Sequence, residues 1–216
     1  MILPTLVLLL PISGVLPASP SAAPIERIVV VLGEKDAVSS SRVVGQMKGC
    51  TDGRPTAVVS AVGGIRIERD FTTDAGFTLA AHLPPEEPGR KQSIAVSLRL
   101  LAEALVPVGS STALVLVAPR LGADSGMSVT SPWQPAVEGE QSPSVESYPT
   151  VAIPASVLEA RKALRKAGLT VVAVNTGRIY DAGAKALTEI PGGRYLQTSQ
   201  GDFGKALVSA VCGTGR

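Results

Sequence analysis

The sequence is poor in the residues that most often bind metals, stack on bases or perform acid–base catalysis. Its 216 residues include one histidine, His82, and two cysteines, so the clustered Cys and His ligands of a zinc site are missing. Aromatic residues make up 3%, too few for the stacking platforms that bind single-stranded nucleic acid. The formal net charge is only +2, so no charge excess requires a nucleic acid or an anionic membrane. We therefore expect no nucleic-acid partner and an aliphatic core, for which the 45% hydrophobic content suffices.

No charged side chain precedes Glu26. An apolar run over residues 2–10 is followed by a stretch rich in Pro, Ser and Ala, and prolines interrupt it well short of the about 20 apolar residues of a transmembrane helix. This pattern predicts a secretory signal peptide over residues 1–23 and no membrane span. The alternative is a buried N-terminal strand or helix, which prolines at this density disfavour. Export would place the two cysteines in an oxidising compartment, where they can pair.

From residue 24 onward, apolar strand patterns alternate with amphipathic helix patterns. The expected strands occupy residues 25–32, 56–62, 65–71, 112–118, 169–174 and 194–198. The expected helices occupy residues 93–105, 156–167, 181–190 and 202–212. This order predicts an α/β fold with a Rossmann-like, doubly wound and mostly parallel sheet, one antiparallel edge strand and helices on both faces.

Two local signals refine this prediction. Gly63-Gly64 has the composition of a two-residue hairpin turn, so the second and third strands should be antiparallel. The third strand alternates charged and apolar residues, which is typical of a sheet edge. Ser156 and Glu159 have the spacing of a capping box, so a helix should begin at Ser156.

Residues 122–150 are rich in Ser, Pro, Gly and Glu and have no sustained apolar period. They predict a long irregular loop, either a binding loop or a disordered segment. The only tryptophan, Trp133, lies there and would be either an exposed anchor or a patch on the core. Residues 24–212 should form one domain, followed by a short tail at 213–216.

The order of the elements resembles the von Willebrand factor A domain family: a central hydrophobic strand, a helix, a hairpin with an antiparallel edge strand, and three strand–helix units. The clearest local match is residues 161–212, RKALRKAGLTVVAVNTGRIYDAGAKALTEIPGGRYLQTSQGDFGKALVSAVC. This segment is similar to the closing helix, strand, helix, strand and helix of that family, with a cysteine at the end. The resemblance covers about residues 25–212. It implies a recognition site beyond the carboxyl ends of the strands, where strand order reverses.

Family members that bind Mg²⁺ at that place use Asp-x-Ser-x-Ser after the first strand, a Thr before the helix that follows the hairpin, and an Asp after the fourth strand. The first motif corresponds here to residues 33–37, Gly-Glu-Lys-Asp-Ala. The Thr falls near Arg90, and the later Asp becomes Pro119. The resemblance thus implies a degenerate metal-ion-dependent adhesion site with no metal and no other cofactor. An alternative register would use Asp36, Ser39 and Ser40.

The same resemblance places a set of charged residues near the position of the missing metal. The residues expected to contact a partner are Glu34, Lys35, Arg90, Lys91 and Arg120. The basic members would receive an acidic group of the partner directly, with arginine offering two parallel donors. The alternative is a solvated rim in which acidic and basic side chains pair with one another.

In the topology that the resemblance implies, the first and last helices run toward the same end of the sheet. A disulfide between Cys50 and Cys212 is therefore expected. The alternatives are two free thiols, or Cys212 bonded to another chain.

Together these expectations describe a secreted, non-enzymatic interaction or adhesion module that binds an extracellular protein or a matrix component. No catalytic residue is expected, since His82 is the only imidazole and the Gly-Ala-Asp-Ser-Gly of residues 122–126 lies in the irregular segment. The turn after the first strand has one glycine where the dinucleotide fingerprint has three. The alternative is a secreted Rossmann-like enzyme or small-ligand carrier with an unrecognised pocket.

Overall fold

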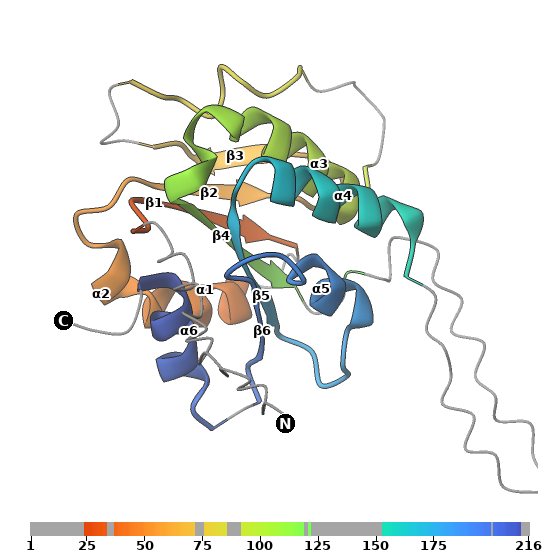
Figure 1. Cartoon of the computed structure of the whole chain (residues 1–216). Helices are drawn as coiled ribbons and strands as arrows, with labels where there is room; N and C mark the ends of the chain where they lie inside the picture. Colours follow the sequence, from red (N-terminus) through yellow and green to blue (C-terminus); the bar gives the residue numbers. More distant parts are fainter. Residues whose placement is uncertain are drawn as a thin grey trace, which may run out of the picture.

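Six strands form a single sheet at the centre of the molecule (Figure 1). The computed structural model describes residues 24–33, 37–71, 76–85, 92–118, 121, 153–199 and 201–212, with only the backbone of residues 37–40. The strands are β1 (Arg27–Leu32), β2 (Thr56–Ser60), β3 (Arg66–Arg69), β4 (Thr112–Ala118), β5 (Thr170–Asn175) and β6 (Arg194–Gln197). Their order is β3-β2-β1-β4-β5-β6, and all neighbours are parallel except β2 and β3. The predicted Rossmann-like fold, with its antiparallel edge strand, is confirmed.

Helices cover both faces of the sheet. One face carries α1 (Ala37–Gln46), α2 (Lys48–Thr51) and α6 (Phe203–Cys212). The other face carries α3 (Ile94–Ala104), α4 (Ala155–Lys166) and α5 (Ala182–Leu187), while the 3-10 helix η1 (Val106–Ser111) leads into β4. None of the described helices is long and apolar enough to cross a membrane.

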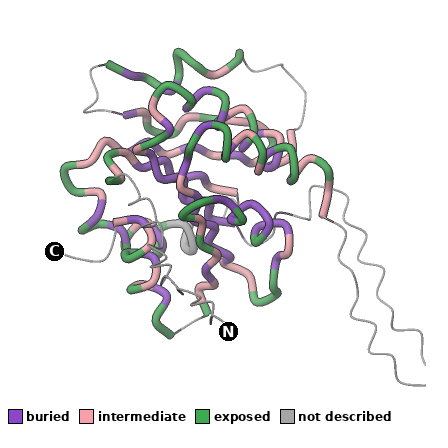
Figure 2. Tube along the Cα trace, in the orientation of Figure 1, coloured by how far each residue is buried: buried purple, intermediate pink, exposed green. Residues whose placement is uncertain are grey.

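The central strands are apolar on both sides because both sides are covered. All seven residues of β4 are buried (Figure 2). Alternate residues of β1, β4 and β5 enter two separate cores. Full burial of a Val, Leu or Ile side chain is worth about 1.5–3 kcal/mol. The continuous apolar runs therefore select a sheet sandwiched between helices, as parallel sheets require.

Two local predictions are wrong. The β2–β3 connection spans residues 61–65 rather than Gly63-Gly64 alone, because the antiparallel pairing ends at Ser60 and Arg66. The Ala61 N–H donates instead to the Leu32 carbonyl of β1, at 2.8 Å. Gly63 has a φ of +77° and forms an isolated bridge with Gln92.

The predicted capping box is also absent. Helix α4 begins at Ala155, and Pro154 occupies the N-cap position without a side-chain hydrogen bond. The Leu158 N–H donates to the Pro154 carbonyl at 3.3 Å, the first bond of the helical pattern, so the helix starts before Ser156, which lies in its first turn. A side-chain cap does occur at α3, where the Ser93 hydroxyl accepts from the Val96 N–H at 3.3 Å.

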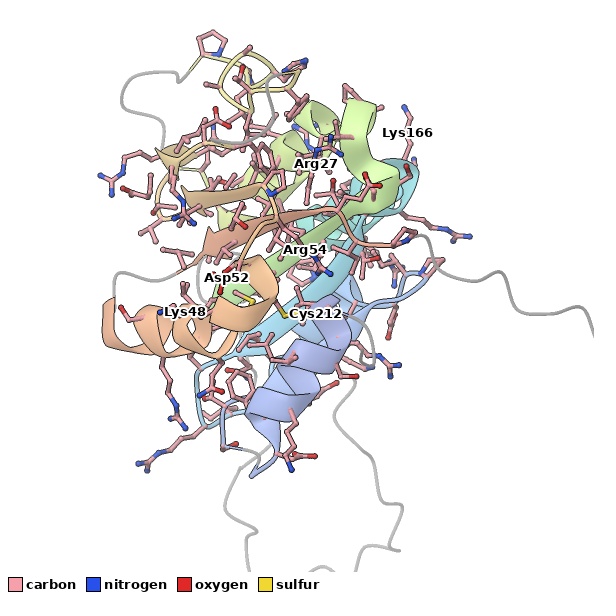
Figure 3. The ribbon with its side chains drawn as sticks, turned by 90° about the vertical axis from the view of Figure 1, so that its left-hand side faces the viewer. Arg27, Lys48, Asp52, Arg54, Lys166 and Cys212 are labelled. Carbon is pink, nitrogen blue, oxygen red and sulfur yellow. A yellow bond between two sulfur atoms is a disulfide. The ribbon has the colours of Figure 1, made fainter. Side chains whose placement is uncertain are left out.

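A disulfide joins the two cysteines, as predicted. Cys50 lies in α2 and Cys212 ends α6, with Cα atoms 5.7 Å apart and a sequence separation of 162 (Figure 3). The bond ties the last helix to the segment between β1 and β2.

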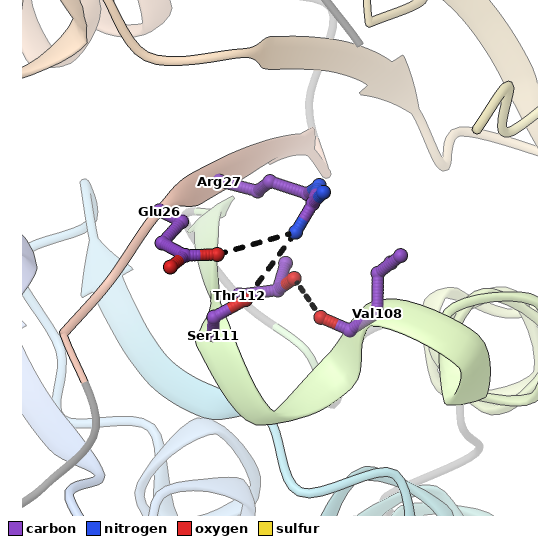
Figure 4. Close-up of polar contacts among 5 residues, drawn as sticks. All are labelled: Glu26, Arg27, Val108, Ser111 and Thr112. Carbon is purple, nitrogen blue, oxygen red and sulfur yellow. Dashed lines mark hydrogen bonds and ion pairs between the residues drawn. The ribbon is translucent and has the colours of Figure 1, made fainter. Parts of the chain in front are cut away.

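The amino end of the sheet is held by structural contacts. Arg27 Nη1 lies 3.6 Å from Glu26 Oε2 and donates to Ser111 Oγ at 3.3 Å, while the Thr112 hydroxyl donates to the Val108 carbonyl at 2.6 Å (Figure 4). These bonds fasten the start of β1 to the turn that enters β4.

Candidate recognition edge

The strand order reverses between β1 and β4, so their carboxyl ends frame the place where open α/β sheets bind ligands. Gly33 directly follows β1, and its N–H donates to the Val117 carbonyl of β4 at 2.8 Å. Ala118 ends β4 beside it.

The space beside Gly33 is already filled. A Cβ atom at this position would lie 2.8 Å from the Ala118 Cβ and 3.1 Å from the Ile94 Cδ1. The first distance is shorter than real Cβ contacts, and an alanine methyl cannot swing away as a long side chain can. An aspartate at residue 33 would therefore force β1 and β4 apart.

The residues present do not fit the magnesium site found in the metal-binding members of the family that the chain resembles. Glycine, lysine and proline occupy positions where that site needs carboxylates and hydroxyls, and the first of these positions has no room for a side chain. Within the described ranges, no three His, Cys, Asp or Glu side chains are grouped so that they could hold a metal ion.

The loop between β5 and α5, residues 176–181, is held by a buried asparagine. The Asn175 Nδ2 donates to the Ile179 carbonyl at 2.7 Å and to the Tyr195 hydroxyl oxygen at 2.8 Å. Its Oδ1 accepts from the Gly177 N–H at 2.7 Å. One side chain thus bonds both halves of the loop and the neighbouring strand β6.

A buried aspartate fixes the other end of this loop. Asp181 is 6% exposed, and its Oδ1 caps α5 by accepting from the Ala184 N–H at 3.0 Å. Its Oδ2 accepts from the Leu121 N–H, and its own N–H donates to the Tyr195 hydroxyl oxygen at 3.1 Å. Asp181 therefore also anchors residue 121, which follows β4 at the same edge.

The tip of the loop is exposed. Arg178 is exposed, and Ile179 and Tyr180 keep 61% and 59% of their surface accessible. These two residues are the most exposed large apolar residues among those described. A cation, an aliphatic side chain and a phenol ring are thus exposed next to one another, on a loop whose backbone is held by Asn175 and Asp181.

The Tyr180 ring is oriented by a second tyrosine. Its centroid lies 5.5 Å from that of Tyr195, in an edge-to-face arrangement. Desolvation, followed by the nearby Tyr195, Glu189 and Asp181, raises the pKa of the Tyr180 phenol above its ordinary value. The phenol therefore remains neutral and can donate a hydrogen bond throughout the physiological pH range.

The expected partner-binding residues Glu34, Lys35, Arg90, Lys91 and Arg120 lie outside the described residues. The predicted signal peptide, the 122–150 segment with Trp133, and the tail at 213–216 also lie outside them. His82 is exposed in a turn, stacks on Phe77 with ring centroids 4.6 Å apart, and its Nδ1 lies 2.9 Å from the Thr78 carbonyl.

The residues that hold the 176–181 loop, Asn175, Asp181 and Tyr195, were not predicted from the sequence. Asn175 is the only asparagine and ends a buried strand, and Asp181 precedes a short helix. The sequence therefore contained a pattern by which both could have been recognised as structural polar residues. No sequence pattern indicates the role of Tyr195, because that role depends on β6 lying next to β5.

A groove of about 580 Å³ lies between α1 and α6, away from this loop. Its lining includes Arg42, Gln46, Asp202, Phe203 and Lys205. Among the described residues, this groove is a feature that the alternative prediction, a small-ligand carrier, could use.

No family model matches this chain. No curated protein matches it either. Among solved structures, the chain is similar to proximal thread matrix protein 1 from the mussel byssus, at 10% sequence identity and a TM-score of 0.39. The match covers 87% of this chain and 48% of the other, so this chain spans about half the length of that protein. A similarity of this size assigns no function.

Proposed function

We propose that this chain is a secreted, non-enzymatic interaction module of the von Willebrand factor A type, which binds an extracellular protein or matrix component without a metal ion. The observation that carries the proposal is the loop at residues 176–181. The buried polar groups Asn175 and Asp181 are engaged in internal hydrogen bonds that fix this loop, and its tip presents exposed side chains.

Rigid presentation favours binding. A loop that is ordered before it meets a partner loses little conformational entropy on association. Tyrosine and arginine are also the residues most often enriched at the energetic centres of protein interfaces. We therefore assign contact with the partner to Arg178, Ile179 and Tyr180, beside the charged residues predicted for the same edge.

Metal independence is supported by Gly33. Its contacts with Ala118 and Ile94 leave no space for the first carboxylate ligand. Recognition would then depend on side chains that meet the partner directly.

Secretion is supported by the disulfide and by the signal-like residues 1–23. Expression of the full chain in a secreting host should release a protein whose N-terminus falls between residues 19 and 24. Retention of the leader on an intracellular protein would contradict this part of the proposal.

The binding test compares the wild-type chain with an Ile179→Ser/Tyr180→Ala variant on a panel of purified extracellular-matrix proteins, with Mg²⁺ and with EDTA. The wild type should bind at least one panel member equally in both buffers, and the variant should bind about tenfold or more weakly, since central aromatic anchors dominate interface energy. The matched control is Val106→Ser, because Val106 is 52% exposed but lies in η1 at the amino end of the sheet. Binding that EDTA abolishes, or that the control weakens as much as the loop variant does, would contradict the proposal.

A further inference from the structure

The outer face of α4 has an excess of positive charge. The helix carries Arg161, Lys162, Arg165 and Lys166 but only one acidic residue, Glu159. Arg161 is neutralised by Glu189 at 2.8 Å. The other three cations are exposed and form no ion pair with any residue in the described ranges. We call Lys162, Arg165 and Lys166 the α4 basic face.

The spacing of these cations does not favour the helix itself. Arg161 and Arg165 are four residues apart, as are Lys162 and Lys166, so each pair brings like charges together on the helix surface. The negative end of the helix dipole favours Arg165 and Lys166, which lie in the last turn. It gives no reason for Lys162, which lies further from the C-terminal end.

Acidic residues on the adjoining helices do not neutralise the α4 basic face. On α3, Glu103 pairs with Arg99 at 3.5 Å, and Glu189, which follows α5, pairs with Arg161. Only Glu159 remains on α4 itself. An elongated partner with repeated negative charges would therefore meet a net positive strip along the helix.

We propose that the α4 basic face binds a sulfated polysaccharide. Sulfate groups along a chain match a row of cations at successive helical turns, and arginine can hold one such group through two parallel donors. The choice of this polyanion rests on the proposed secretion, because a secreted protein meets sulfated polysaccharides outside the cell.

Two other polyanions fit this surface less well. Nucleic acid is disfavoured because aromatic residues for base stacking are scarce, at 3% of the chain. A lipid surface is disfavoured because Leu158 is the only large exposed apolar residue among those described on α4, which leaves little to insert between acyl chains.

The test uses heparin as the probe and the full, disulfide-bonded chain. The variant Lys162→Ala/Arg165→Ala/Lys166→Ala removes the α4 basic face, and alanine preserves the helix because its helix propensity is the highest. The control Arg42→Ala/Lys48→Ala/Lys205→Ala removes the same charges from exposed positions on α1, α2 and α6. Figure 3 labels Lys166 at the end of α4 and Lys48 on α2, on well-separated parts of the molecule. The control also removes both cations of the groove between α1 and α6.

The wild type and the control should bind heparin with similar affinity, and the α4 variant should bind about tenfold or more weakly with a smaller dependence on salt concentration. Equal weakening by the control would overturn the proposal, because the attraction would then follow net charge. Unchanged binding by the α4 variant, undiminished binding of desulfated heparin, or stronger binding to duplex DNA or phosphatidylserine vesicles would also overturn it.

A fourth protein separates this inference from the proposed function. The Ile179→Ser/Tyr180→Ala variant should keep its heparin affinity while losing its matrix-protein partner. Loss of heparin binding in that variant would overturn the assignment to α4. Unchanged binding of the matrix protein by that variant would count only against the proposed role of the 176–181 loop.

Discussion

Removing the Cys50–Cys212 disulfide should lower the free energy of unfolding by about 5 kcal/mol. The bond closes a loop over a sequence separation of 162. In the chain-entropy relation, a loop of that length reduces the entropy of the unfolded chain by about 17 cal/mol/K, which is about 5 kcal/mol at 25 °C. Domains of ordinary stability unfold with about 5–15 kcal/mol, so the loss would be a large share of the total.

Guanidinium unfolding of the wild type and of a Cys50→Ala/Cys212→Ala variant measures this loss. The transition midpoint should fall. The slope of free energy against denaturant should rise, because an unfolded chain without the cross-link is more expanded and exposes more surface. The native fold should persist, since Met47, at the N-cap of α2, and Leu207 of α6 are both buried in the same apolar core.

The single variants provide the control. Either Cys50→Ala or Cys212→Ala breaks the same cross-link, so each single variant should lose nearly as much stability as the double variant. A loss below about 1 kcal/mol in the double variant, or single losses that simply add, would contradict the entropic argument. Mass spectrometry of the non-reduced wild type should find the two cysteine peptides joined.

Three further variants test the carboxyl edge. Asp181→Ala should lower the free energy of unfolding by about 2–4 kcal/mol, because it removes the cap of α5 and the carboxylate that accepts from the Leu121 N–H. A loss no larger than that of the exposed Asp52→Ala would contradict this. Gly33→Asp should destabilise by about 1–3 kcal/mol through overpacking, and Mg²⁺ should not raise its melting temperature; a Mg²⁺-dependent rise would show that the edge can hold a metal. Because the pKa of Tyr180 is raised in the folded protein, the unfolded chain loses the phenol proton at a lower pH than the folded chain does, so wild-type stability should fall as pH rises above about 10. Tyr180→Phe should reduce that fall in alkaline denaturation, and identical alkaline profiles would count against the raised pKa.

Local pattern accounts for most of the architecture. The apolar runs of β1, β4 and β5 identify strands covered on both faces, and the period of α3 and α6 identifies helices with one buried side. The boundaries were less predictable. Ser156 has the chemistry of a helix cap, but the helix begins one residue earlier, at Ala155, because the Pro154 carbonyl already accepts the first helical hydrogen bond, from the Leu158 N–H.

Composition and periodicity were sufficient for the sheet class and for the edge position of the antiparallel strand, because each of these depends on residue type or on short-range spacing. The crowding around Gly33 arises only when β1 and β4 lie side by side under α3. The convergence of Asn175, Asp181 and Tyr195 arises only when β5 and β6 are neighbours. Residues 60 positions apart then share a hydrogen bond, as Leu121 and Asp181 do. Contacts of this kind leave no periodic trace along the chain, since the packing of whole elements, and not the preference of any one residue, brings the partners together.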